Sequence, residues 1–117
     1  MDRSLTYYLA GPMSGIPDFN FPAFEQASRE LRSQGIKIES PHEIQQEIPG
    51  TLPYNDVIVR ALDLLKTCRG IILLPGWAGS NGVVHHELAM ARQFNMPVLY
   101  YGYWPDQPSL IEMGGGQ

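Results

Sequence analysis

Glu87 is the residue whose type and position most clearly suggest chemistry. A step of about 100° per residue gives residues 82–94 the pattern of a helix with one broad apolar face. Glu87 falls on that face together with Val83, Val84, Leu88, Met90, Ala91 and Phe94. A carboxylate that faces a core loses its water, and ionisable groups with pKa values shifted in this way cluster at functional sites. We therefore expect a binding or catalytic role; the alternative is that Glu87 lies where the face opens to solvent or caps nearby backbone amides.

Two glycine-containing segments that follow apolar runs are suited to binding a ligand. The first, residues 10–15, contains Gly11, Pro12 and Met13, and the second, residues 75–82, contains Gly76, Trp77, Ser80, Asn81 and Gly82. In open α/β sheets, ligands bind outside the carboxyl ends of the strands, where loops and helix N-termini present free backbone donors. Glycine lets the backbone approach a ligand closely, and the alternative is that these glycines only make tight turns. We expect both segments to bind substrate beside Glu87.

The remaining reactive side chains predict neither a metal site nor a cofactor. Cys68 is the single cysteine and cannot form an internal disulfide, and the three histidines, His42, His85 and His86, match no zinc spacing. On the helical projection, His85 and His86 point away from the apolar face. We expect them at the surface or in an interface.

Four short apolar runs alternate with segments of helical period, which is typical of a parallel sheet covered by helices on both faces. The third run is apolar throughout, as a central buried strand requires. Asn20 is expected to cap the first helix. Residues 42–54 are expected to form a loop, and the tail, about residues 105–117, to be partly disordered, above all 114–117. The expected strands are residues 5–10, 36–39, 70–74 and 97–101, and the expected helices run from about 20 to a stop at Gly35, from 54 to 67 and from 82 to 94.

Composition predicts a soluble globular protein with a single domain over residues 1–117. Hydrophobic residues make up 44% and charged residues 17% of the chain. No apolar run approaches the roughly 20 residues that cross a bilayer, and the N-terminal apolar stretch is too short for a signal peptide, so a cytoplasmic location is expected. A formal net charge of −4 argues against binding the phosphate backbone of DNA or RNA. The expected partner is a small molecule, not a membrane or a polymeric nucleic acid.

Two motifs in order carry a family resemblance. The chain reads Tyr8-Leu9-Ala10-Gly11-Pro12-Met13, then Leu74-Pro75-Gly76-Trp77, Ser80, Gly82, Glu87 and Pro97-Val98. With these residues it resembles the nucleoside 2-deoxyribosyltransferase-like superfamily, over about residues 5–101. The resemblance implies a three-layer flavodoxin-like, or Rossmann-like, α/β fold of four to five strands in the order 2-1-3-4(-5). It also implies a homo-oligomer, a dimer or a tetramer, and cleavage or transfer at an N-glycosidic bond.

The resemblance also implies roles for particular residues. Glu87 would be the nucleophile that attacks the anomeric carbon of the sugar through an oxocarbenium-like transition state. Tyr8 would orient this carboxylate or hydrogen-bond the sugar. Ser80, Asn81 and Gly82 would meet sugar hydroxyls or a 5′-phosphate. Trp77 is suited to stacking on a base, and the alternative for a loop tryptophan is simple packing.

Two departures from the family pattern keep other functions open. Glu87 is five residues after Gly82, whereas the family's glutamate is four residues after its loop glycine, and Ala61 follows Arg60 where the family has a supporting aspartate. Asp63 is the substitute acid only if its helix packs differently from the projection, which places it on the polar face. The favoured function is a nucleoside or nucleotide N-glycosidic hydrolase or transferase. The alternatives are a nucleotide-binding module without catalysis and a nucleoside monophosphate phosphoribohydrolase.

Overall fold

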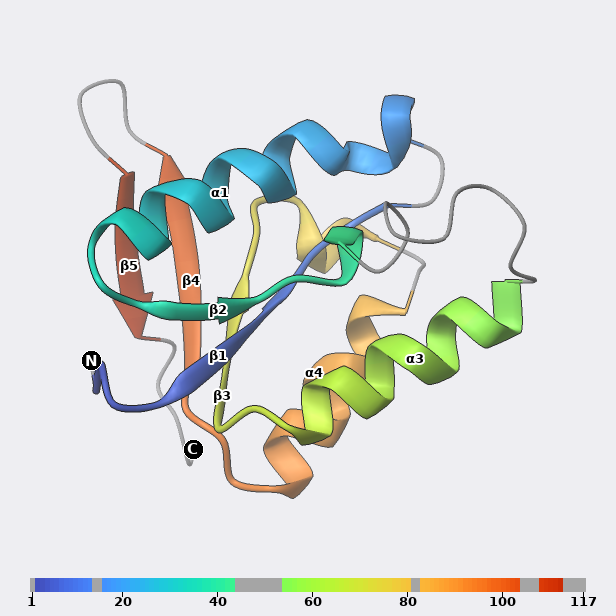
Figure 1. Cartoon of the computed structure of the whole chain (residues 1–117). Coiled ribbons are helices and arrows are strands. Elements are labelled where there is room, and N and C mark those ends of the chain that lie inside the picture. Colours follow the sequence, from blue (N-terminus) through green and yellow to red (C-terminus); the bar gives the residue numbers. More distant parts are fainter. Residues whose placement is uncertain (1, 14–15, 44–53, 81–82, 104–107, 113–117) are drawn as a thin grey trace.

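A computed structural model describes residues 2–13, 16–43, 54–80, 83–103 and 108–112. They form a five-stranded sheet in the order β2-β1-β3-β4-β5, with helices on both faces (Figure 1). The first four strands pair in parallel and β5 runs antiparallel to β4. The strands are β1 (Thr6–Ala10), β2 (Lys37–Glu39), β3 (Gly70–Leu73), β4 (Val98–Tyr103) and β5 (Pro108–Glu112), and the helices are α1 (Phe21–Ser33), α3 (Tyr54–Lys66) and α4 (Val84–Gln93). This confirms the flavodoxin-like α/β fold and the order 2-1-3-4.

Alternating side chains of the central strands divide the interior into two cores. In β1, Tyr7 and Leu9 face α1, whereas Tyr8 and Ala10 face α3 and α4. Side chains of β3 are buried on both faces, as the apolar run predicted. The core under α1 contains Phe24, Ala27, Leu31, Ile36, Ile38 and Ile72, and the core under α3 and α4 contains Leu65, Cys68, Ile71, Leu73, Val84, Leu88 and Ala91.

Three local features differ from the sequence expectation. Asn20 does not cap α1, because it adopts a left-handed conformation with φ 61° and donates its side-chain amide to the carbonyl of Pro12, 2.9 Å away. The tail supplies β5, whose backbone pairs with β4, while residues 113–117 lie outside the described part. Residues 41–43 form a helical turn in place of the start of the expected loop, and residues 44–53 are likewise outside the described part. No helix among the described residues is long and apolar enough to span a membrane.

Candidate functional site

The carboxyl group of Glu87 is buried against the phenol of Tyr8. Glu87 is 2% exposed and Tyr8 0%. The Tyr8 hydroxyl donates a hydrogen bond to Oε2 of Glu87, which joins the middle of β1 to the first turn of α4. The expected position of Glu87 on the apolar helix face is confirmed, and the alternative that it lies open to solvent is wrong.

Burial changes the acidity of both partners in this pair. Desolvation raises the pKa of Glu87 from 4.5 to about 7, even though the hydrogen bond from Tyr8 lowers it. The pKa of Tyr8 lies well above its usual range, because of burial first and then because of the neighbouring Glu87 charge. Near neutral pH, Glu87 is therefore close to the midpoint of its titration.

The loops after β1 and β3 meet at the carboxyl edge of the sheet. The amide of Leu74 donates to the carbonyl of Ala10 at 2.8 Å, so the two strand ends are hydrogen-bonded. Gly76 has φ +87°, a conformation that favours glycine, and a Cβ added there would lie 3.6 Å from Cγ of Pro12. Gly11 and Pro12 are buried, and Met13 is half-buried against the core under α1. The structure thus brings the two expected binding segments together.

The loop after β3 is tied to the first turn of α4 through a histidine. Trp77 begins the 3₁₀ turn Trp77–Gly79 and packs, half-buried, against the core under α3 and α4. Nε2 of His85 lies 2.6 Å from the carbonyl oxygen of Ser80, and the rings of Trp77 and His85 are 6.1 Å apart. His85 and His86 are exposed, as expected. Asn81 and Gly82 lie outside the described residues.

Helix α3 packs as the sequence projection predicts. Ala61, at the position where the family's aspartate was expected, is 3% exposed and faces the interior. The Asp63 side chain is 66% exposed and lies 3.7 Å from Nζ of Lys66. The condition under which Asp63 would replace the missing acid is not met, and the structure does not bring it to Glu87.

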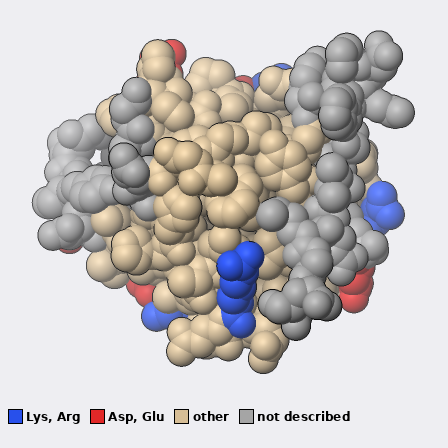
Figure 2. Space-filling model, turned by 180° about the vertical axis from the view of Figure 1, so that it is seen from behind, with Lys and Arg blue, Asp and Glu red and all other residues tan. Residues whose placement is uncertain are grey.

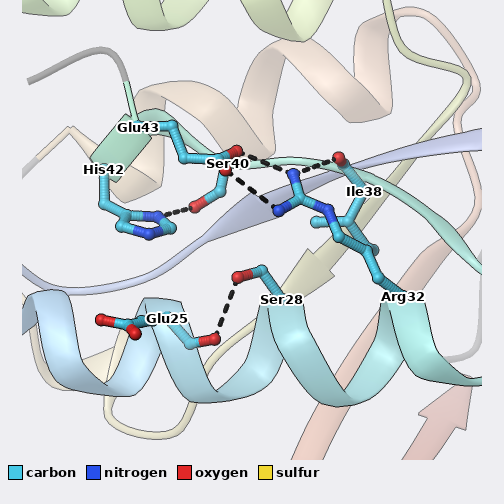
Figure 3. Close-up of polar contacts among 7 residues, drawn as sticks. All are labelled: Glu25, Ser28, Arg32, Ile38, Ser40, His42 and Glu43. Atoms are coloured by element: carbon cyan, nitrogen blue, oxygen red, sulfur yellow. Dashed lines mark hydrogen bonds and ion pairs between the residues drawn. The ribbon is translucent and has the colours of Figure 1, made fainter. Parts of the chain in front are cut away.

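Sequence reasoning missed a second buried polar group, which follows β2. Ser40 is 1% exposed and His42 3%, and Oγ of Ser40 lies 2.5 Å from Nδ1 of His42 (Figure 3). Alternation along this segment, in which Ile36 and Ile38 are buried and the residues between them exposed, would have placed Ser40 inside.

A salt bridge fixes the chain directly after this group. Arg32, near the end of α1, donates to both carboxylate oxygens of Glu43, at 3.0 and 2.7 Å, and to the carbonyl of Ile38 at 2.8 Å (Figure 3). These bonds lower the pKa of Glu43 and raise that of Arg32. Among the described residues, no group of three or more His, Cys, Asp or Glu side chains lies close enough to hold a metal ion.

Comparisons with known proteins agree with this fold. The model of a family described as a domain of unknown function, DUF4406, matches residues 5–100. Nine chains of solved structures match. One is a 2-deoxyribosyltransferase from the psychrotolerant bacterium Bacillus psychrosaccharolyticus, with a TM-score of 0.64 and 21% identity, covering 81% of this chain and 70% of that chain. No curated protein matches significantly. At this identity, the structural likeness shows a shared fold.

Proposed function

The chain belongs to the DUF4406 family, and from that premise and the geometry at Glu87 we propose that it binds a nucleoside or nucleotide and cleaves or transfers its N-glycosidic bond. The observation that carries the proposal is the buried Tyr8–Glu87 pair at the sheet. A fold shared with a protein named as a 2-deoxyribosyltransferase supports it.

In the proposed reaction, the ionised carboxylate of Glu87 attacks the anomeric carbon of the sugar. The C1′–N bond breaks, its electron pair leaves with the base, and the base takes up a proton from solvent, which the attacking water or second base returns in the next step. An ester bond to Glu87 forms in the same step. Water or a second base then attacks the same carbon and releases the carboxylate. The Tyr8 hydroxyl holds the carboxylate in one orientation throughout.

The loops at the carboxyl edge are proposed to hold the rest of the substrate. Backbone amides at Gly11 and Met13 and within residues 76–80 are the proposed donors to sugar hydroxyls or a 5′-phosphate beside the start of α4. Trp77 packs against the core and is proposed to position this loop, with its ring tilted by 54° to that of His85.

The direct test is release of free base, measured by chromatography, from 2′-deoxynucleosides and their 5′-monophosphates. The Glu87→Gln variant still accepts the Tyr8 hydrogen bond but cannot attack, so release should fall at least about a thousandfold. His86→Gln, at an exposed position on the same helix, is the control and should keep full activity. Absence of release from every substrate, or equal release by Glu87→Gln, would reject the proposal.

The pH profile provides a second test. Release should rise with pH through about 7, because Glu87 must be ionised to attack. Since the Tyr8 hydrogen bond lowers the pKa of Glu87, Tyr8→Phe should move this rise to higher pH and reduce kcat. The matched change Tyr7→Phe removes a hydroxyl that donates to the carbonyl of Asp2, on the opposite face of the sheet, and should leave the profile in place.

A second candidate function is nucleotide binding without catalysis. It is favoured by Ala61 at the position of the expected acid and by the exposure of Asp63. This alternative predicts that nucleotides raise the melting temperature but are recovered intact.

A third candidate function is that of a nucleoside monophosphate phosphoribohydrolase. Comparing base release from ribonucleoside and deoxyribonucleoside 5′-monophosphates distinguishes it from a hydrolase or transferase of deoxyribosyl groups.

A further inference from the structure

His42 is held on several sides, although nothing in the proposed reaction at Glu87 uses it. Ser40 Oγ contacts its Nδ1 at 2.5 Å. The ring of Phe21 lies 5.9 Å away and edge-on, and the ring of Phe24 lies 6.1 Å away and tilted by 36°. Because its partners fix the imidazole in one orientation, the direction of its second nitrogen, Nε2, is also fixed. Such fixation is typical of histidines with a functional hydrogen bond.

The second nitrogen of His42 is available to a ligand. Among the described residues, none forms a hydrogen bond with Nε2, and no fully buried side-chain nitrogen or oxygen lacks a partner. Nε2 therefore keeps contact with solvent although the residue as a whole is only 3% exposed. The charged side chains that act on the ring are Glu25 of α1, Glu43 and Arg32, but desolvation dominates and lowers the pKa of His42. At neutral pH the ring is neutral and offers one donor and one acceptor.

His42 belongs to the same edge of the sheet as the loops around Glu87. β2 pairs in parallel with β1, with Glu39 opposite Tyr8, so the residues that follow Glu39 emerge beside the end of β1. The side-chain amide of Asn20 donates to Pro12 and ties the start of α1, where Phe21 lies, to the loop after β1. The His42 group therefore lies on the α1 side of this loop and Glu87 on the α4 side.

We infer that Phe21, Ser40 and His42 form the subsite that receives the nucleobase, with Nε2 of His42 hydrogen-bonded to the edge of the base and the half-exposed ring of Phe21 against its face. This inference rests on the proposed function, since it assumes that the ligand's sugar is at Glu87. Phe19, 59% exposed and 6.1 Å from Phe21, extends the aromatic surface.

Ser40 determines what His42 can offer to the base. A serine hydroxyl rotates freely between donating and accepting. When it donates to Nδ1, Nε2 carries the proton and donates to a carbonyl or ring nitrogen; when it accepts from Nδ1, Nε2 accepts from an exocyclic amine. The salt bridge between Arg32 and Glu43 holds the backbone just after His42, so the subsite is built on fixed elements (Figure 3).

The test separates the two ring nitrogens of His42. An asparagine amide reaches the position of Nδ1 and keeps the bond to Ser40 but lacks Nε2, whereas a glutamine amide reaches the position of Nε2. With Glu87→Gln as the common background, so that no base is released during the titration, calorimetry would measure the binding of the four 2′-deoxynucleoside 5′-monophosphates and of 2-deoxyribose 5-phosphate, which has no base. His42→Asn should lower the affinity for at least one nucleotide about tenfold, the effect of one lost hydrogen bond, and should leave the affinity for the sugar phosphate unchanged. His42→Gln should restore most of that affinity, and His86→Asn should bind like the unmodified Glu87→Gln background.

Each other result overturns the inference. An equal loss for nucleotides and sugar phosphate would show a merely structural role, and unchanged nucleotide affinity in His42→Asn would show no contact with the base. Nucleotides that bind the Glu87→Gln background no tighter than the sugar phosphate would exclude a base subsite altogether. Base release is measured in a separate assay, and its absence rejects the proposed reaction at Glu87. The change in nucleotide affinity between His42 and its variants still tests whether His42 contacts the base.

Discussion

Glu87 combines a cost in stability with the reactivity that the proposed reaction needs. Its carboxyl group is shielded from water and accepts one hydrogen bond, from the phenol of Tyr8. The charged form is therefore poorly stabilised in the folded protein. The same desolvation keeps the carboxylate reactive near neutral pH. Its hydrogen-bond partner is the neutral phenol of Tyr8, which offsets less of the desolvation than a cation would.

The pH dependence of stability follows from the raised pKa of Glu87. Between pH 4.5 and about 7, the folded protein keeps a proton that the unfolded chain has lost, so stability falls as pH rises through this window. Above pH 7 the loss amounts to about 3 kcal/mol. Glu87→Gln has no such loss and should be more stable than wild type at pH 8, by up to that amount, but nearly equal to it at pH 4.5. Urea unfolding at both pH values measures this, and a pH-independent difference would contradict it.

Individual site residues were predictable to different degrees. Helical periodicity suffices to bury Glu87, because burial on a helix depends on neighbours within four residues. Its contact with Tyr8 joins residues 79 positions apart, and only the family resemblance suggested it. Alternation after β2 would have placed Ser40 inside, but the contacts of His42 were missed because they are made with Phe21 and Phe24, which belong to another element. No local pattern contains that information.

At the scale of elements, the ends of β1 and β3 approach so closely that packing alone explains Gly11. A Cβ added to Gly11 would lie 2.8 Å from Cβ of Leu74, on the strand end that is hydrogen-bonded to Ala10. Gly11 thus serves a close approach of two backbones, whereas Gly76 is needed for its positive φ.

Gly11→Ala should therefore destabilise the protein by about 1–3 kcal/mol, the usual cost of overpacking. The matched control is Gly79→Ala, where an added Cβ has no neighbour within 4 Å and the change should stay within about 0.5 kcal/mol. Thermal or urea unfolding of the two variants gives the comparison. Equal effects would mean that the strand ends separate easily and that Gly11 is not constrained by Leu74.

The sheet illustrates which elements a sequence specifies by itself. Apolar runs and helical spacing predicted the four parallel strands and three helices to within about two residues. The run of the fifth strand, Pro108–Glu112, lies in a tail rich in proline and glycine, and its structure comes from the free edge that β4 offers. The prediction that Asn20 caps the first helix was wrong for a similar reason, because its side-chain amide donates to the carbonyl of Pro12 instead.

At the scale of the whole molecule, both faces of the sheet are covered and the carboxyl edge is where the polar groups that could bind a ligand gather. The formal net charge is −4, and Figure 2 shows isolated basic side chains on a largely uncharged face instead of a continuous basic patch. A polymeric nucleic acid would need such a patch to release counterions from its backbone. A single nucleotide needs only the local donors of the loops.

This contrast predicts different responses to a nucleotide and to its polymer. A deoxynucleoside 5′-monophosphate at a hundredfold excess over its dissociation constant should stabilise the fold by about 2.7 kcal/mol and raise the melting temperature by roughly 10 °C. Duplex DNA at physiological salt should give neither a thermal shift nor a complex in a gel-shift assay, because the net negative charge of the protein repels its phosphates. Differential scanning fluorimetry measures the melting temperature with each nucleotide of a panel and, in parallel, with duplex DNA. DNA binding that weakens steeply with added salt would contradict the charge argument, and a panel without any shift would contradict the nucleotide site itself.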